Sequence, residues 1–144
     1  MQYNKMRESI KHIKGIELIP GDLFDVLEGY AKYRDPLKVA LFSYGHLDFC
    51  KTAAVLLRDY NLYSNLQWLA KWSQLKTTFY LDISVACRCD EDKMYERFFQ
   101  TYVPDIFAMC GWKVEDPRNC DTKFYKTYRD ATPMANALYK MTKK

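Results

Sequence analysis

The chain has 144 residues, of which 49% are hydrophobic and 28% charged, and its net charge is +4. This length and composition predict one globular domain, residues 1–144, and exclude fibrous and disordered chains because Gly and Pro number only five each. No apolar run approaches the ~20 residues of a membrane span, and the first residues lack the apolar part of a secretory signal. Five cysteines in no framework spacing favour a reducing compartment, so we expect a protein of the cytoplasm or nucleus.

The charges are distributed unevenly. Residues 1–15 carry +3 and the C-terminal segment 113–144 carries +4, whereas residues 16–112 carry −3. Two basic ends around a mildly acidic body indicate an anionic partner for the ends. Exposed ends that use lysine as a solubiliser produce the same pattern, so both interpretations stay open.

The first part of the chain is predicted to be helical. The spacing of apolar residues predicts two helices before Asp35-Pro36, where the proline breaks the second one. The stretch DPLKVALFSYGHLDFCKTAAVLL then resembles the helix-turn-helix of an ankyrin repeat, with its Pro-Leu start and its GHLD before the second helix. The resemblance covers one possible repeat, and stable arrays need about three. It therefore implies an α-hairpin over 36–60 and nothing beyond that. The short apolar run VALF, residues 39–42, could instead be a buried strand, so this alternative stays open.

The most regular stretch is TTFYLDISVACRC, residues 77–89. Its strict alternation predicts a strand whose odd-numbered side chains enter the core. One helix is predicted before it, over 64–75, and another after it, over 90–111. The strand is therefore the expected centre of the fold.

The last third of the chain is polar and basic. Weak strands at 112–115 and 123–128 are expected to pair with strand 77–89, because a lone strand would leave its backbone ladder unpaired. A last helix is predicted from Pro133 to Met141. The expected fold is α+β and mainly helical, with about six helices packed on a small antiparallel sheet.

Asp82 is the first candidate for chemistry. It lies on the polar face of the predicted strand between Tyr80 and Ser84, where a strand can fix the direction of a carboxylate in a metal-dependent nuclease. Such a site needs a second carboxylate, and the acidic residues 90–92 are better explained as helix caps. The alternative is a solvent-facing residue paired with Arg88.

Cysteines provide a second, weaker candidate. Cys87 and Cys89 point to one side of the predicted strand, so they could share a metal with Cys110, Cys120 or His46. They also continue the apolar row of the strand, and buried cysteine packs as a small hydrophobe. No Gly-rich phosphate loop, nucleophile elbow or dinucleotide fingerprint is present. We therefore assign no catalytic residue, no metal ligand and no cofactor.

The stretch KFYKTYR, residues 123–129, alternates cations with aromatic rings. This pattern suits single-stranded nucleic acid, because bases stack on the rings while cations meet phosphates. The predicted nucleic-acid contacts are Lys123, Tyr125, Lys126, Tyr128 and Arg129. The same rings can instead dock the segment onto the body of the domain.

A protein-binding surface is predicted on the helix before the strand. Trp68 and Trp72 lie four residues apart and cannot both face inward beside the leucines of that helix, and Lys71 lies between them. Large aromatic residues anchor many protein interfaces. Trp68, Lys71 and Trp72 are therefore the predicted partner contacts.

These observations rank three functions. The first is a non-enzymatic intracellular regulator or adaptor that binds another protein. The alternative is an RNA- or single-stranded nucleic-acid-binding protein that uses the basic, aromatic ends of the chain. The third is a metal-dependent nuclease centred on Asp82. No membrane partner is expected.

Overall fold

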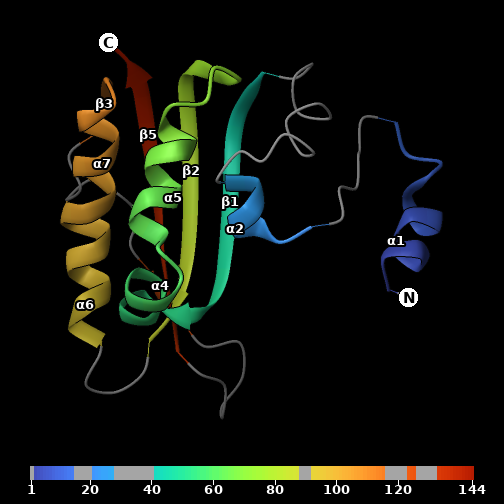
Figure 1. Cartoon of the computed structure of the whole chain (residues 1–144), viewed down its shortest axis with the longest axis horizontal. Coiled ribbons are helices and arrows are strands. Elements are labelled where there is room, and N and C mark those ends of the chain that lie inside the picture. The colour runs from blue at the N-terminus through green and yellow to red at the C-terminus, as the bar shows by residue number, and fades with distance from the viewer. Residues whose placement is uncertain (1, 15–20, 28–40, 88–91, 116–122, 126–132) are drawn as a thin grey trace.

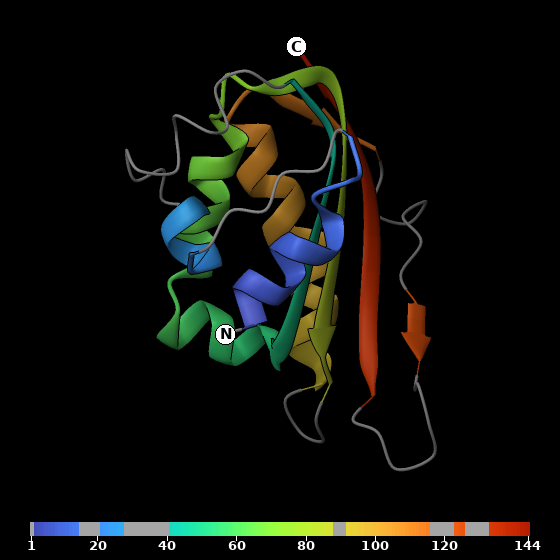
Figure 2. The ribbon, with the colours of Figure 1, turned by 90° about the vertical axis from the view of Figure 1, so that its right-hand side faces the viewer.

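The computed structural model describes residues 2–14, 21–27, 41–87, 92–115, 123–125 and 133–144. These residues form a sheet with helices stacked against one of its faces (Figures 1 and 2). Within this part of the chain, no helix has both the length and the apolar character needed to cross a bilayer.

The sheet is mixed. Its strands are β1 (Phe42–Thr52), β2 (Leu75–Ala86), β3 (Trp112–Val114), β4 (Lys123–Tyr125) and β5 (Met134–Lys143). They follow the order β1-β2-β5-β3, and β4 also pairs with β5. β1 runs parallel to β2, and β5 is antiparallel to all three of its neighbours. β5, the last strand in the sequence, is therefore the central one.

Helices connect the strands and cover one face. The helices are α1 (Gln2–Ile10), α2 (Leu23–Leu27), α4 (Ala53–Asp59), α5 (Leu62–Ala70), α6 (Asp92–Arg97) and α7 (Val103–Met109). The crossover between parallel β1 and β2 contains α4 and α5, as a parallel connection requires. A π-helical turn, η2 (Phe98–Tyr102), joins α6 and α7 into one long helix. α1 lies at the right in Figure 1, apart from the sheet and the helix layer.

The core lies between the sheet and these helices. Alternate residues of β2 and β5 enter it: Phe79, Leu81, Ile83, Val85, Ala135, Ala137, Tyr139 and Met141. Each fully buried Leu, Ile, Phe or Met contributes about 1.5–3 kcal/mol. Two buried polar groups find partners across the layers, because Trp112 Nε1 donates to the Ala70 carbonyl at 2.8 Å and the Tyr139 hydroxyl donates to the Phe99 carbonyl at 2.6 Å.

The predicted strand 77–89 is confirmed as β2, which begins two residues earlier, at Leu75. Its odd-numbered residues are buried from Phe79 to Cys87, which lies just beyond the strand, but Thr77 is exposed and Cys89 lies outside the described residues. The α+β class is confirmed, but the expectation of a mainly helical chain is slightly off. The described residues form five helices when α6 and α7 count as one, and strands take almost as large a share.

The α-hairpin predicted over 36–60 is wrong, because residues 42–52 form β1 and, within the described range 41–60, only α4 is helical. Gly45, in the GHLD of the ankyrin-like stretch, does not lie in a turn between two helices. It instead belongs to the inward-facing row of a strand, followed by buried Leu47 and Phe49. His46 and Asp48, which lie between them, face the other side of the sheet. This alternation has a period of two residues, which is that of a strand and not of a helix.

The helix predicted from Pro133 to Met141 is also wrong, because these residues form β5. Ala, Leu, Met and Lys favour helices, but pairing with β2 outweighs that preference. The weak strand at 112–115 appears as β3 and the first half of the one at 123–128 as β4, whereas residues 126–128 lie outside the described residues. Both strands pair with β5 and, in the described part of the chain, neither pairs with β2. The expected antiparallel sheet is mixed because β1 joins it.

Candidate functional site

Figure 2 shows the helix layer on one side of the sheet. On the other face, several side chains of the described strands are exposed, among them Tyr44, His46 and Tyr80. Cross-strand partners lie on the same face, with Cβ atoms ~4.5–5.5 Å apart in antiparallel pairs. The strand registers arrange this face in three rows across β1, β2 and β5: Tyr44, Tyr80 and Lys140; His46, Asp82 and Leu138; Asp48, Ser84 and Asn136. We call the first of these the tyrosine row.

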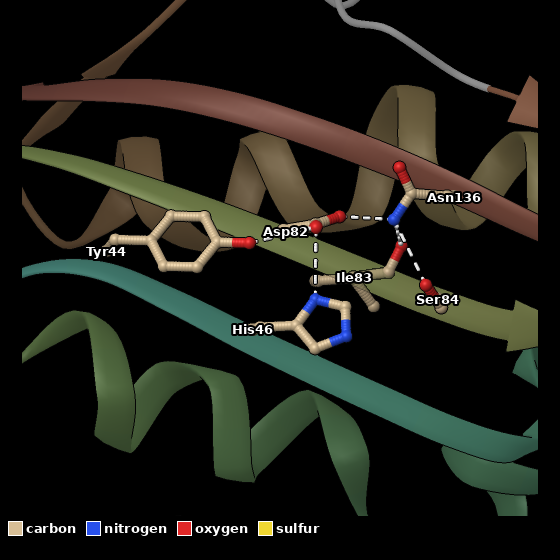
Figure 3. A network of polar contacts seen from close by, with 6 residues as sticks. All are labelled: Tyr44, His46, Asp82, Ile83, Ser84 and Asn136. Atoms are coloured by element: carbon tan, nitrogen blue, oxygen red, sulfur yellow. Dashed lines mark hydrogen bonds and ion pairs between the residues drawn. The ribbon is translucent and has the colours of Figure 1, made fainter. Parts of the chain in front are cut away.

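Asp82 is the centre of a polar cluster on this face (Figure 3). Its Oδ2 atom accepts hydrogen bonds from the Tyr44 hydroxyl at 3.1 Å and from His46 Nδ1 at 3.0 Å. Its Oδ1 atom accepts from Asn136 Nδ2. Donors from β1 and β5 therefore meet on one carboxylate of β2, and they fix its direction.

Asn136 links the carboxylate to the backbone of β2. Besides Asp82, its Nδ2 atom lies 3.0 Å from Ser84 Oγ and 3.2 Å from the Ile83 carbonyl oxygen. Ser84 is buried, and its hydroxyl oxygen accepts the hydrogen bond from Asn136 Nδ2. Tyr44, His46, Asp82, Ser84 and Asn136 together form what we call the Asp82 cluster.

The pKa of Tyr44 is raised within the Asp82 cluster. Loss of hydration around the phenol, the hydrogen bond to Asp82 and the negative charge of Asp82 all raise the pKa of Tyr44. Tyr44 therefore stays protonated beside the carboxylate and continues to donate to it. Its ring remains 53% exposed on the sheet surface.

This arrangement can do two things chemically. The exposed rings of the tyrosine row offer flat apolar surfaces beside the Lys140 ammonium group, which suits a planar anionic ligand. The Asp82 cluster holds an imidazole ring in a fixed orientation on the neighbouring row, which suits hydrogen bonding or proton transfer.

Asp82 lies on the polar face of its strand, as the alternation predicted, but the partner proposed for it, Arg88, lies outside the described residues. His46, Tyr44 and Asn136 are its partners instead. Among the described residues, no group of three or more His, Cys, Asp and Glu side chains is placed to hold a metal ion.

The predicted nucleic-acid contacts are only partly described. Lys123 and Tyr125 lie in β4, where they pair with Asn136 and Met134 of β5. The other three contacts, Lys126, Tyr128 and Arg129, lie outside the described residues. β4 therefore brings the start of the basic, aromatic stretch to the strand that carries Asn136 of the Asp82 cluster.

The three predicted partner contacts differ in how far they are buried. Trp68 is 47% exposed on α5, and Lys71 is exposed just after it. Trp72 is half-buried and, with Leu27 and Phe79, lines an apolar cavity of about 230 Å³ between α2, α5 and the sheet. Trp68 and Lys71 are thus on the surface, whereas Trp72 belongs to the interior.

The cysteines also differ in burial, and only some of them lie in the described residues. Cys87 packs in the core, as the apolar interpretation expects, and Cys110 is half-buried against the core just before the start of β3. Cys89 and Cys120 lie outside the described residues.

Sequence reasoning missed Tyr44, Tyr80, Asn136 and Lys140 as site residues. Three of them lie in stretches that were assigned to helices, where strand registers cannot be drawn. The missed signal was the alternation of polar and apolar residues in SYGHLDF and in MANALYKM, which has the strand period of two.

The chain matches no protein-family model, no curated protein and no solved structure at a significant level.

Proposed function

We propose that the protein binds single-stranded nucleic acid on the open face of its sheet, with the tyrosine row as the base-stacking platform. The observation that carries the proposal is the alignment of Tyr44, Tyr80 and Lys140 across three adjacent strands, on the face opposite the described helices that cover the sheet. Bases stack on exposed aromatic rings irrespective of sequence, and lysines meet the phosphates between them.

Cations flank the rings on one side. Lys140 lies on β5, and exposed Lys113 on β3 pairs with Thr142, two residues further along. Lys140 Nζ lies 3.8 Å from Glu115 Oε1, but both side chains are substantially exposed. Such exposed pairs contribute only ~0–1 kcal/mol, so a phosphate can replace the carboxylate. The net charge of +4 favours an anionic partner in the same sense.

Replacing Tyr80 by alanine tests the platform. Tyr80 lies outside the Asp82 cluster, so Tyr80→Ala removes a stacking ring without breaking that cluster. We expect affinity for a fluorescent single-stranded oligonucleotide, measured by anisotropy, to fall about 5- to 150-fold, equivalent to ~1–3 kcal/mol per stacked base.

The matched control is Tyr63→Ala. Tyr63 is exposed on α5 to almost the same extent as Tyr80, 37% against 38%, but it does not belong to the open sheet face. This variant should bind as the wild type does. An equal loss in both variants, or no binding by the wild type at low salt, would reject the proposal.

The lysines predict the salt dependence. For a single strand, each phosphate contact removed should reduce the slope of log K against log salt by ~0.7. We therefore expect Lys140→Ala and Lys113→Ala each to flatten the slope, with the Tyr80→Ala slope unchanged.

A second candidate is the regulator or adaptor role in the cytoplasm or nucleus, favoured by the exposure of Trp68 on α5. This helix belongs to the layer opposite the tyrosine row, so the two functions are separable by mutation. A purified protein partner should lose affinity on Trp68→Ala and keep it on Tyr80→Ala. Dependence on Tyr80 in place of Trp68 would assign the partner to the sheet face.

A further inference from the structure

The Asp82 cluster leaves one reactive atom facing outward. An ionised carboxylate only accepts hydrogen bonds, so His46 Nδ1, 3.0 Å from Asp82 Oδ2, must carry the hydrogen between them. In the neutral ring the other nitrogen, Nε2, then holds a free lone pair. Figure 3 shows Nε2 on the side of the ring away from Asp82, and it has no hydrogen-bond partner among the described residues.

The imidazole is both oriented and accessible. The His46 side chain is 46% exposed, whereas that of Asp82 is 20% exposed. The three donors that surround Asp82 keep its carboxylate from rotating, and Asp82 in turn fixes the tautomer and direction of His46. A general base needs this combination of a held ring and an open lone pair.

The described residues supply no nucleophile for this base. Ser84 Oγ accepts a hydrogen bond from Asn136 Nδ2 and its residue is buried. Cys50 is exposed on β1 but four residues from His46, ~13 Å along an extended strand. The group that His46 activates must therefore come from the substrate.

The neighbouring row indicates which substrate. His46 lies two residues from Tyr44 on the same strand face, about 7 Å away. A base stacked on Tyr44 would leave the sugar and phosphate of an adjacent nucleotide near His46. RNA carries its own nucleophile there, the 2′-hydroxyl, next to the phosphorus atom it can attack.

Building on the proposed function, we propose that His46 is the general base of a metal-independent RNA cleavage and that Asp82 is its positioning residue. The 2′-oxygen forms a bond to the adjacent phosphorus while the bond from phosphorus to the 5′-oxygen breaks. His46 Nε2 takes the 2′-hydroxyl proton. The leaving 5′-oxygen takes a proton from water, and protonated His46 neutralises the hydroxide that remains. The products are a 2′,3′-cyclic phosphate and a 5′-hydroxyl end.

The test uses the full chain and a labelled single-stranded RNA, with EDTA in one set of reactions and Mg²⁺ in a parallel set. A DNA strand that contains one ribonucleotide should be cut only at that ribonucleotide, leaving a cyclic phosphate. An all-DNA strand of the same sequence should bind without being cut. Cleavage of the all-DNA strand, or loss of RNA cleavage in EDTA, would overturn the inference.

Variants assign the roles. His46→Ala should reduce kcat about 10²- to 10⁴-fold, the usual contribution of a general base. Binding of the all-DNA strand reports folding and should be unchanged in this variant. Free imidazole should restore part of the lost rate, because the vacated position is exposed. Unchanged cleavage, or no rescue in a variant that still binds, would contradict the role of His46.

Asp82→Asn separates positioning from binding. It should reduce kcat with KM nearly unchanged, whereas Tyr80→Ala should mainly raise KM, and Tyr63→Ala should change neither. Binding of RNA without cleavage by the wild type would overturn the catalytic inference and leave the proposed function intact. Absence of both binding and cleavage would overturn both.

Discussion

At the scale of single residues, Tyr44 links two features of the sheet face, since its ring belongs to the tyrosine row and its hydroxyl donates to Asp82. The raised pKa of Tyr44 connects the cluster to stability, because folding favours the protonated phenol over the phenolate. The stabilisation is fully present below the ordinary value of 10.0 and is lost as pH rises through the higher pKa of the folded state.

Tyr44→Phe tests this linkage. The difference in unfolding free energy between wild type and Tyr44→Phe should be constant below pH 10 and should shrink above it, because only the wild type has a phenol to ionise. Urea unfolding between pH 8 and 11 measures it. In an Asp82→Asn background, the pH dependence of this difference should weaken. A difference in unfolding free energy that grows above pH 10 would contradict the expected loss of stabilisation.

At the scale of elements, β1 approaches β2 closely at Gly45. A Cβ atom at Gly45 would lie 3.1 Å from Phe79 Cζ, and Phe79 is itself buried against Trp112. The neighbour cannot move away freely, so the contact should cost more than alanine gains over glycine in backbone entropy.

We therefore expect Gly45→Ala to destabilise the protein by about 1–3 kcal/mol in urea unfolding. Phe79→Leu shortens the side chain that Cβ would meet. In that background the cost of Gly45→Ala should be smaller, which a double-mutant cycle would show as coupling. Additive effects, or stabilisation by Gly45→Ala alone, would show that the two strands can separate there.

The elements also show how far sequence reasoning reaches. β2 was predictable because its alternation is strict and its apolar residues are strong strand formers. β5 was not predictable, because its helix-favouring composition is outweighed by pairing with β2. The residues of β2 that pair with β5 lie 48 or more positions earlier in the chain. Asp82 could be singled out as a strand carboxylate. Its partners could not, because His46 and Asn136 reach it only through the registers of β1 and β5.

At the scale of the whole molecule, α1 is much less buried than the sheet and the helix layer, so we expect it to contribute less to stability. Its described side chains from Asn4 to Ser9 are exposed, and Ile10 is half-buried. Trp112, in contrast, is fully buried, contacts the rings of Phe79 and Phe107, and donates to the Ala70 carbonyl.

Deleting residues 1–14 should therefore change the unfolding free energy by less than about 1 kcal/mol, whereas Trp112→Ala should cost about 3–5 kcal/mol. Thermal and urea unfolding measure both. A large loss on deleting residues 1–14 would show that this segment packs against the body in solution.

The position of β5 has a consequence for synthesis on the ribosome. β1 precedes β2 in the chain, but the second partner of β2 begins to emerge 48 residues after Ala86, on the order of 2–10 s later at ordinary elongation rates. During that interval the nascent chain presents an unpaired strand edge with a row of apolar side chains, which is the surface that holdase chaperones bind. Codon choice between residues 87 and 133 would then affect the yield of folded protein without changing a single amino acid.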